Sequence, residues 1–145
     1  MNLRFLLKKK KYGPFLVLLL LLISLWIKQN APHTAENSAL LTAIESRASG
    51  TQVSGSGVVT AILRDDTKGS RHQRFIVSIP TGQTVLIAHN IDLAPRIDSL
   101  HVGDEVGFYG EYEWNNKGGV IHWTHKDPKG HHVAGWLKHH SIIYQ

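Results

Sequence analysis

Histidine is the residue type through which this sequence is best equipped to do chemistry. The chain has ten histidines in 145 residues, and nine of them follow position 70. Imidazole changes charge between about pH 5 and 8 and is a common metal ligand. A histidine-rich region therefore suggests metal binding, proton transfer or a response to pH, and the spacing of the histidines shows which of them can act together.

The largest candidate cluster comes from a predicted hairpin that turns at Thr81 and Gly82. In this register Arg74 faces His89, and both point away from the core with His72, because side chains alternate across a strand. The core face of the hairpin would carry Phe75, Val77, Ile79, Leu86 and Ala88. A register shift of one residue would instead place His89 in the core.

The loop before this hairpin must reach the same end of the domain, which adds two acidic side chains to the cluster. The predicted ligand-binding residues are Asp65, Asp66, His72, Arg74 and His89. If a divalent metal binds here, its ligands would be Asp66, His72 and His89, since carboxylate and imidazole are common zinc ligands. The alternative is a solvated loop with ordinary charge pairs.

A second predicted hairpin, which turns at Asn116 and Lys117, supplies secondary candidates. Glu111 faces His122 in this register, either as a cross-strand charge pair or as part of a site. His122 and His125 are three residues apart on a strand and point to opposite faces, so they do not form a chelating pair. The core face would carry Phe108, Tyr112, Trp114, Ile121 and Trp123, and the outer face Glu111, Glu113, His122 and Thr124.

The turn at residues 127–130 lies among further histidines. His125 and Asp127 are two residues apart and would share one side of the chain. They form another secondary candidate site, and the alternative is a surface loop that is rich in histidine. The sequence contains no nucleophile elbow, phosphate-binding loop or dinucleotide fingerprint.

Five predicted strands must position these residues. The β-branched and aromatic runs at 58–63, 75–79, 85–88, 106–114 and 120–125 are separated by turn residues, which indicates a mainly β domain. Their spacing is typical of a small five-stranded barrel of the oligonucleotide/oligosaccharide-binding (OB) type. An extra strand or hairpin is expected at 135–144. A short helix is expected at 35–48, capped by Thr34, with Leu40 and Ile44 on one face.

The N-terminal segment predicts a membrane anchor. Residues 15–27 are apolar apart from one serine and follow a run of four lysines. A helix over 12–27 would be about 24 Å long, slightly shorter than a bilayer core. The lysines favour a cytoplasmic N-terminus and a domain on the far side. A cleaved signal peptide is the alternative. We therefore expect an anchor at 1–28, a linker and short helix at 29–50, and a barrel at 51–145.

The charge of the chain is concentrated in this anchor. Residues 1–28 contain six cationic residues and no acidic one, whereas the remainder contains ten cationic and eleven acidic residues. This distribution disfavours nucleic-acid binding through an overall positive field of the domain, and a local basic patch is the alternative. The absence of cysteine excludes disulfides and thiol nucleophiles.

Several strings of the domain resemble one family. They include AHNIDLAPR at residues 88–96 and GGVIHWTHKDP at residues 118–128, and the resemblance covers residues 50–145. The family consists of small exported bacterial proteins with a domain of unknown function. The resemblance implies an exported bacterial protein. Together with the predicted anchor, this gives the expectation of a single-pass protein of the bacterial inner membrane, with its domain in the periplasm or outside the cell. The resemblance implies no activity and no functional residue.

Three functions are compatible with these patterns. The first is a membrane-tethered extracytoplasmic module that recognises a small ligand, a glycan or a protein. The second is a metal-assisted hydrolase, for example of phosphodiesters, in which Arg74 would neutralise a developing anion. The third is an envelope protein that responds to pH through its histidines.

Overall fold

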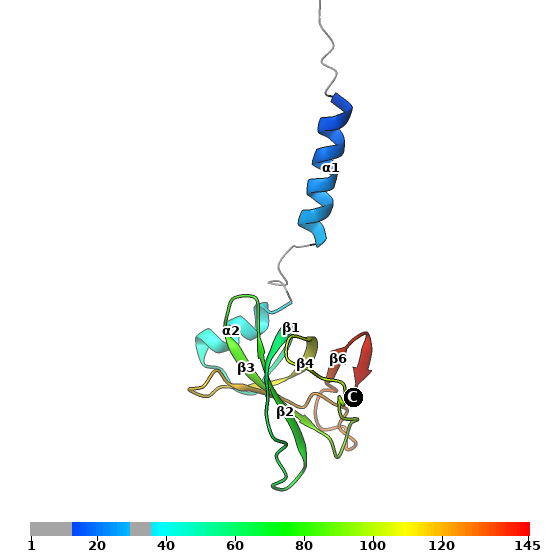
Figure 1. Cartoon of the computed structure of the whole chain (residues 1–145). Coiled ribbons are helices and arrows are strands. Elements are labelled where there is room, and N and C mark those ends of the chain that lie inside the picture. Colours follow the sequence, from blue (N-terminus) through cyan, green and yellow to red (C-terminus); the bar gives the residue numbers. More distant parts are fainter. Residues whose placement is uncertain (1–12, 30–35) are drawn as a thin grey trace, which may run out of the picture. The chain divides into compact units, whose positions relative to one another are not determined.

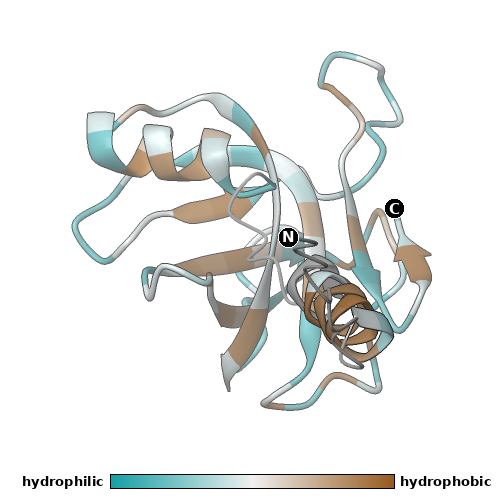
Figure 2. Cartoon of the chain, turned by 90° about the horizontal axis from the view of Figure 1, so that it is seen from above, coloured by the Kyte–Doolittle hydropathy of each residue, from teal (hydrophilic) through white to brown (hydrophobic). Residues whose placement is uncertain are grey.

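The computed structural model describes residues 13–29 and 36–145. It divides into two compact units, residues 1–32 and 33–145. The lysine run of the predicted anchor and the predicted cap Thr34 lie outside the described residues. Helix α1 (Gly13–Gln29) belongs to the first unit, and its described side chains are exposed and mostly apolar (Figure 2). No helix in the described residues is both long and apolar enough to span a membrane, so the predicted transmembrane span is not supported.

Helix α2 (Ser38–Ser46) opens the second unit and packs on the barrel with its apolar side. Leu40 and Ala43 are buried, and Ile44, which was expected on the same face as Leu40, is partly buried against the core. The helix ends earlier than predicted because Arg47 adopts a left-handed conformation with φ of 54°. Its backbone N–H then bonds the carbonyl of Ile44, which closes the last turn.

The second unit is mainly β, as predicted, and contains a closed five-stranded barrel (Figure 1). The seven strands of its sheet are β1 (Thr51–Ile62), β2 (His72–Ser78), β3 (Thr84–Asn90), β4 (Glu105–Glu113), β5 (Val120–His122), β6 (Trp136–His139) and β7 (Ile142–Tyr144). The barrel order is β1-β2-β3-β5-β4, and β4 returns to pair with β1. Only the β3–β5 pairing is parallel. The predicted C-terminal hairpin is confirmed as β6–β7, which extends the sheet beyond β4.

The barrel core follows the alternation of the strands. Every second residue of β2, β3 and β4 is buried, in agreement with the period of a half-buried strand. The largest fully buried apolar side chains are Tyr112, Phe75, Phe108, Leu40, Ile87, Ile97, Ile121 and Leu137. Polar side chains are also enclosed in the barrel, among them Gln73 and His89.

The predicted register of the β2–β3 hairpin is wrong by one residue. Arg74 faces Ala88, and His89 faces Gln73. The reason lies in the turn: the N–H of Ile79 bonds the carbonyl of Gln83 across a three-residue connection, not the two-residue turn expected. Because a shift of one residue exchanges the two faces of a strand, the core face of β3 carries Val85, Ile87 and His89 in place of Leu86 and Ala88.

The predicted pairing of β4 with β5 is confirmed, because Glu111 faces His122. The alternation then fails at Trp123, whose φ is 51°. This left-handed conformation is uncommon for a bulky residue. As a result Thr124, which was predicted to face outward, is fully buried. Trp114, which was predicted in the core, is 36% exposed.

Candidate functional site

The predicted cluster of acidic, histidine and arginine side chains does not come together. The carboxylate of Asp65 forms an ion pair with Arg96. The side chain of Arg74 donates two hydrogen bonds, of 3.0 and 2.8 Å, to the carbonyl of Arg64. The bonds of Arg74 hold the loop before β2 against that strand, and the ion pair of Asp65 joins the loop to the segment after β3. The binding role of the five predicted residues stays a prediction, and His72 is the one among them that lines the pocket described below.

Asp66 lies beside His72 through its backbone. The two residues form an isolated antiparallel bridge, with N–H to O distances of 3.0 and 2.9 Å. The side chain of Asp66 accepts the N–H of Lys68 at 3.0 Å. This hydrogen bond lowers the pKa of Asp66. The carboxylate therefore shapes the turn that leads into β2.

His89 is a core residue in this structure. Its exposed fraction is 0%, which corrects the prediction that it points outward with His72 and Arg74. Its Nε2–H donates a hydrogen bond to the carbonyl of Pro95 at 3.1 Å. Its Nδ1 therefore accepts a hydrogen bond from the hydroxyl of Thr124 at 2.9 Å. Burial lowers the pKa of His89 to about 4. With both ring nitrogens occupied, this neutral imidazole has no lone pair for a metal.

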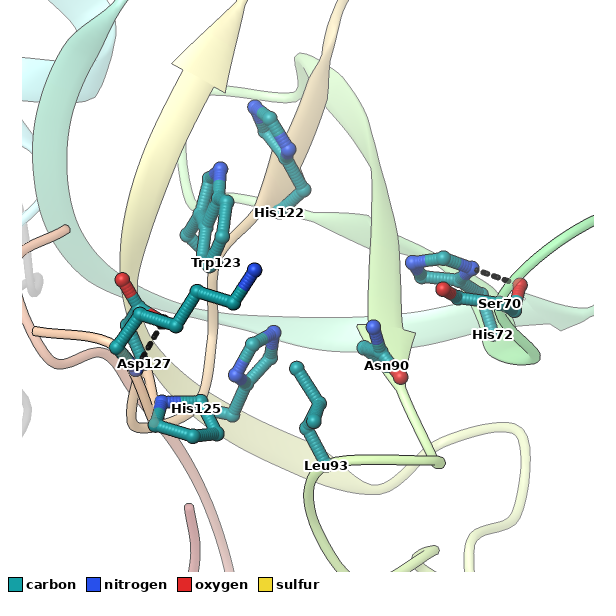
Figure 3. A pocket seen from close by; sticks show the side chains of 10 residues that line it. Ser70, His72, Asn90, Leu93, His122, Trp123, His125 and Asp127 are labelled. Atoms are coloured by element: carbon teal, nitrogen blue, oxygen red, sulfur yellow. Dashed lines mark hydrogen bonds between the residues drawn. The ribbon is translucent and has the colours of Figure 1, made fainter. Parts of the chain in front are cut away.

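A pocket of about 550 Å³ opens where β2 begins and where the parallel strands β3 and β5 end (Figure 3). Its lining residues are Ser70, His72, Asn90, Leu93, His122, Trp123, His125, Asp127, Pro128 and Lys129. In Figure 3, His72 and Ser70 lie on one side, Trp123 and His125 lie on the other, and Leu93 and Asn90 lie between them. The carboxyl ends of neighbouring parallel strands meet at one edge of a sheet, which is why these distant segments converge.

The rings of His72 and His125 are each held by a hydrogen bond from Nδ1 to a backbone carbonyl. The Nδ1–H of His72 donates to the carbonyl of Ser70 at 2.8 Å. The Nδ1–H of His125 donates to the carbonyl of Lys126, also at 2.8 Å. In the neutral ring, Nε2 then keeps its lone pair. His125 is only 3% exposed, so it is not the surface-loop residue that the alternative reading of its turn assumed.

Trp123 forms the aromatic wall of the pocket. Its ring stacks on that of His132 with centroids 3.7 Å apart and also contacts the ring of His125 at 5.4 Å. Backbone strain of this kind costs about 1–3 kcal/mol and persists where the surrounding contacts impose it. Here the stack with His132 and the burial of the next two residues impose the conformation.

Asp127 organises the loop that carries His132. Its carboxylate accepts the backbone N–H groups of Lys129, His131 and His132 at 2.9, 2.7 and 3.1 Å. These bonds lower the pKa of Asp127, the largest contribution being that of Lys129. The carboxylate thus holds the 127–132 turn in place and acts on the pocket through the position of His132.

Asn90 is a pocket residue that the sequence patterns did not single out. Its side-chain oxygen accepts the N–H of Asp92 at 2.9 Å, which leaves its amide nitrogen as a donor toward the pocket (Figure 3). Leu93 is also in the wall and is 43% exposed, unusually high for leucine. Both lie in the 88–96 string that resembles a family, which was the available signal for them.

Within the described residues, two groups of three side chains are close enough to share a metal ion. One is Asp104, His139 and His140, and the other is Glu111, Glu113 and His122. Neither contains the predicted ligands Asp66, His72 and His89. Burial lowers the pKa of His122, an effect that the nearby carboxylates of Glu111 and Glu113 oppose.

Comparison with known protein families assigns the chain to one of them. The model of a family described as "Protein of unknown function (DUF3465)" matches residues 20–145. The match covers most of the sequence, so the chain belongs to this family. The predicted membership of a family of unknown function is confirmed, whereas export and a bacterial membrane stay predictions. No curated protein matches the chain.

Proposed function

We propose that this domain is a binding module whose pocket takes a small ligand with hydroxyl groups, such as a sugar residue of a glycan. The observation that carries the proposal is the 550 Å³ pocket, whose wall is set by Trp123 in a left-handed conformation. Ligand sites are commonly concave, largely apolar and equipped with a few oriented polar groups. This pocket has that composition.

The polar groups match the chemistry of hydroxyls. With Nδ1–H of His72 and His125 bonded to backbone carbonyls, the neutral form of each ring offers Nε2 as an acceptor, and the amide nitrogen of Asn90 offers a donor. Trp123, Leu93 and Pro128 offer apolar surface beside them. A sugar ring presents an apolar face together with hydroxyls that both donate and accept, so one pyranose can use both kinds of wall.

The architecture supports the same assignment. A five-stranded barrel in the order β1-β2-β3-β5-β4, with β3 and β5 parallel, agrees with an OB-like barrel. Barrels of this type bind oligosaccharides and oligonucleotides on the face of their second and third strands. The pocket lies at the β2 and β3 ends of that face.

Ligand-observed NMR with a panel of mono- and oligosaccharides tests the proposal. Saturation transfer from the protein to a sugar is expected, and Leu93→Ala and His72→Ala should each weaken binding by about tenfold or more, equal to about 1.4 kcal/mol. Val102→Ala is the matched control, because Val102 is an apolar residue, 62% exposed, outside the pocket. Saturation transfer that is equal in all three variants would refute the assignment of the pocket.

Metal-assisted hydrolysis is the second candidate. The observation that favours it is the anchoring of His72 and His125 by backbone carbonyls, since metal-binding histidines usually donate their other ring nitrogen in this way. Hydrolysis of a chromogenic phosphodiester by the full-length chain should then stop in chelator and return with added metal. Activity that persists in chelator would refute it.

A further inference from the structure

A second group of polar side chains lies on the outer face of the β4–β5 pair. Glu111 and Glu113 are two residues apart on β4 and share that face, and His122 faces Glu111 from β5. Figure 3 shows the imidazole of His122 directed away from those of His72 and His125. The group therefore forms a site of its own at the border of the pocket.

The distances within this group do not correspond to hydrogen-bonded ion pairs. Nε2 of His122 lies 3.5 Å from Oε1 of Glu111 and 4.0 Å from Oε1 of Glu113. A charge-assisted hydrogen bond would be about 2.7–2.9 Å long. The Nε2 atom is itself buried and makes no hydrogen bond to any described residue. A buried ring nitrogen between two carboxylates lacks a partner at hydrogen-bonding distance.

A metal ion at the centre accounts for this spacing. The three ligand atoms lie within 4.8 Å of one another. Zinc bonds to nitrogen and oxygen of about 2.0–2.2 Å place two ligands of a tetrahedral ion about 3.4 Å apart. The pair of Glu111 and His122 already has this separation, and the second carboxylate needs only a small side-chain movement. The positive ion would also remove the repulsion between the two glutamates.

We propose that Glu111, Glu113 and His122 bind a divalent metal ion of the zinc class. Two carboxylates and an imidazole are ligands that zinc and related ions accept. His132 borders these three ligands, since its Nδ1 lies 3.8 Å from Oε2 of Glu111, and the fourth position on the ion would be open to water. Through its stack on Trp123, His132 would link the ion to the wall of the pocket.

The surrounding structure holds the ligands in place before any ion binds. Glu111 and His122 project from paired strands, and the next pair of the ladder, Tyr112 and Ile121, is fully buried. The backbone N–H of Gly50 donates to Oε1 of Glu113 at 3.2 Å, which orients that carboxylate. Ligands on rigid strands, with a neighbouring group that orients one of them, are features of built metal sites.

The test is a titration of zinc into the full-length chain, purified without an affinity tag in non-ionic detergent and treated with chelator. Calorimetry should show a single ion per chain, and Glu113→Gln and His122→Gln should each weaken binding by about tenfold or more. The controls are His140→Gln, which removes a ligand from the rival group, and Asp98→Asn, whose carboxylate is 87% exposed. Both should bind zinc as the parent does.

Titration with cobalt(II) tests metal binding at this site independently, through the visible absorption of the bound ion. The visible absorption of a four-coordinate cobalt centre should appear in the parent and in His140→Gln and be absent from His122→Gln. Glu113 is on the surface, so Glu113→Gln should keep the parent melting temperature without metal, which separates loss of a ligand from loss of the fold. The absence of zinc binding, or loss of binding in His140→Gln alone, would overturn the proposal. Neither titration contains a sugar, so a negative result would overturn the metal site without contradicting the proposed sugar-binding function of the pocket.

Discussion

Gln73 and His89 face each other across the β2–β3 ladder, and both side chains point into the barrel. Gln73 binds the backbone of Ile97 twice, donating to its carbonyl and accepting its N–H, each at 2.9 Å. His89 donates to the carbonyl of Pro95 at 3.1 Å. Three hydrogen bonds from two core polar residues thus fasten the segment after β3 to the barrel, beside the pocket.

Replacing Gln73 with leucine should destabilise the domain. The change leaves the N–H and carbonyl of Ile97 buried without partners, at a cost of about 1–3 kcal/mol for each lost group. Urea denaturation followed by tryptophan fluorescence should therefore give a free energy of unfolding lower by about 2–4 kcal/mol. Gln83→Leu, at an exposed turn position, should change it little. Equal effects of the two changes would contradict this role of Gln73.

Acidification should destabilise the domain through His89. Its pKa is about 4 in the folded state and near 6.5 in the unfolded chain, so the unfolded chain binds more protons between these values. The stability that neutral His89 provides is complete above about pH 6.5 and is lost progressively as the pH falls toward 4. The difference in pKa corresponds to about 3 kcal/mol.

Urea titrations at a series of pH values measure this effect. The variant His89→Gln has no ionisable group at this position and should show a flatter profile between pH 4 and 6.5, even though it is less stable at neutral pH. The variant His101→Gln removes a histidine whose side chain is 78% exposed and should keep the parent slope. An unchanged slope in His89→Gln would show that other groups cause the acid sensitivity.

Gly119 and Gly130 provide a matched test of close packing. Both adopt positive φ, of 88° and 67°. A Cβ at Gly119 would overlap the ring of Tyr112, whereas a Cβ at Gly130 would have no atom within 4 Å. Gly130→Ala should cost about 1–2 kcal/mol for backbone strain alone. Gly119→Ala should cost clearly more in thermal or urea unfolding, and similar costs would show that Tyr112 can move aside.

The predicted membrane anchor at residues 1–28 is tested by fractionating cells that express the chain. We propose that it keeps its N-terminal segment and stays with membranes after extraction with sodium carbonate, as a signal-anchor does. A variant that lacks residues 1–29 should appear in the soluble fraction. Mature protein that begins near residue 31 by N-terminal sequencing would instead establish a cleaved signal peptide.

The two hairpins show how far sequence patterns predict this fold. Between β4 and β5 the turn is rich in glycine and asparagine, and the predicted partners Glu111 and His122 are correct. Between β2 and β3 the connection has an odd number of residues, which no local pattern revealed, and this exchanged the faces of β3. The candidate site built on an outward His89 depended on that register.

The pocket was harder to predict for a different reason. Its wall depends on Trp123, whose backbone conformation is imposed by a stack with His132 and by the burial of Thr124. These contacts join a strand end to a loop, so alternation along the strand carries no information about them. The sequence indicated the histidines as chemically important, but only tertiary packing shows which of them share a space.

The closure of the barrel has a consequence for the nascent chain. β1 pairs with β4, which brings Thr51 opposite Tyr112, and β3 pairs with β5, which is made last of the five barrel strands. No single hairpin completes the barrel, and such long-range pairing slows folding. Until β4 is made, β1 has an unpaired edge, and until β5 is made, β3 has one, and another chain can join either edge. A chain that stalls before Val120 should therefore aggregate, and the cell must protect this domain until its fifth strand is made.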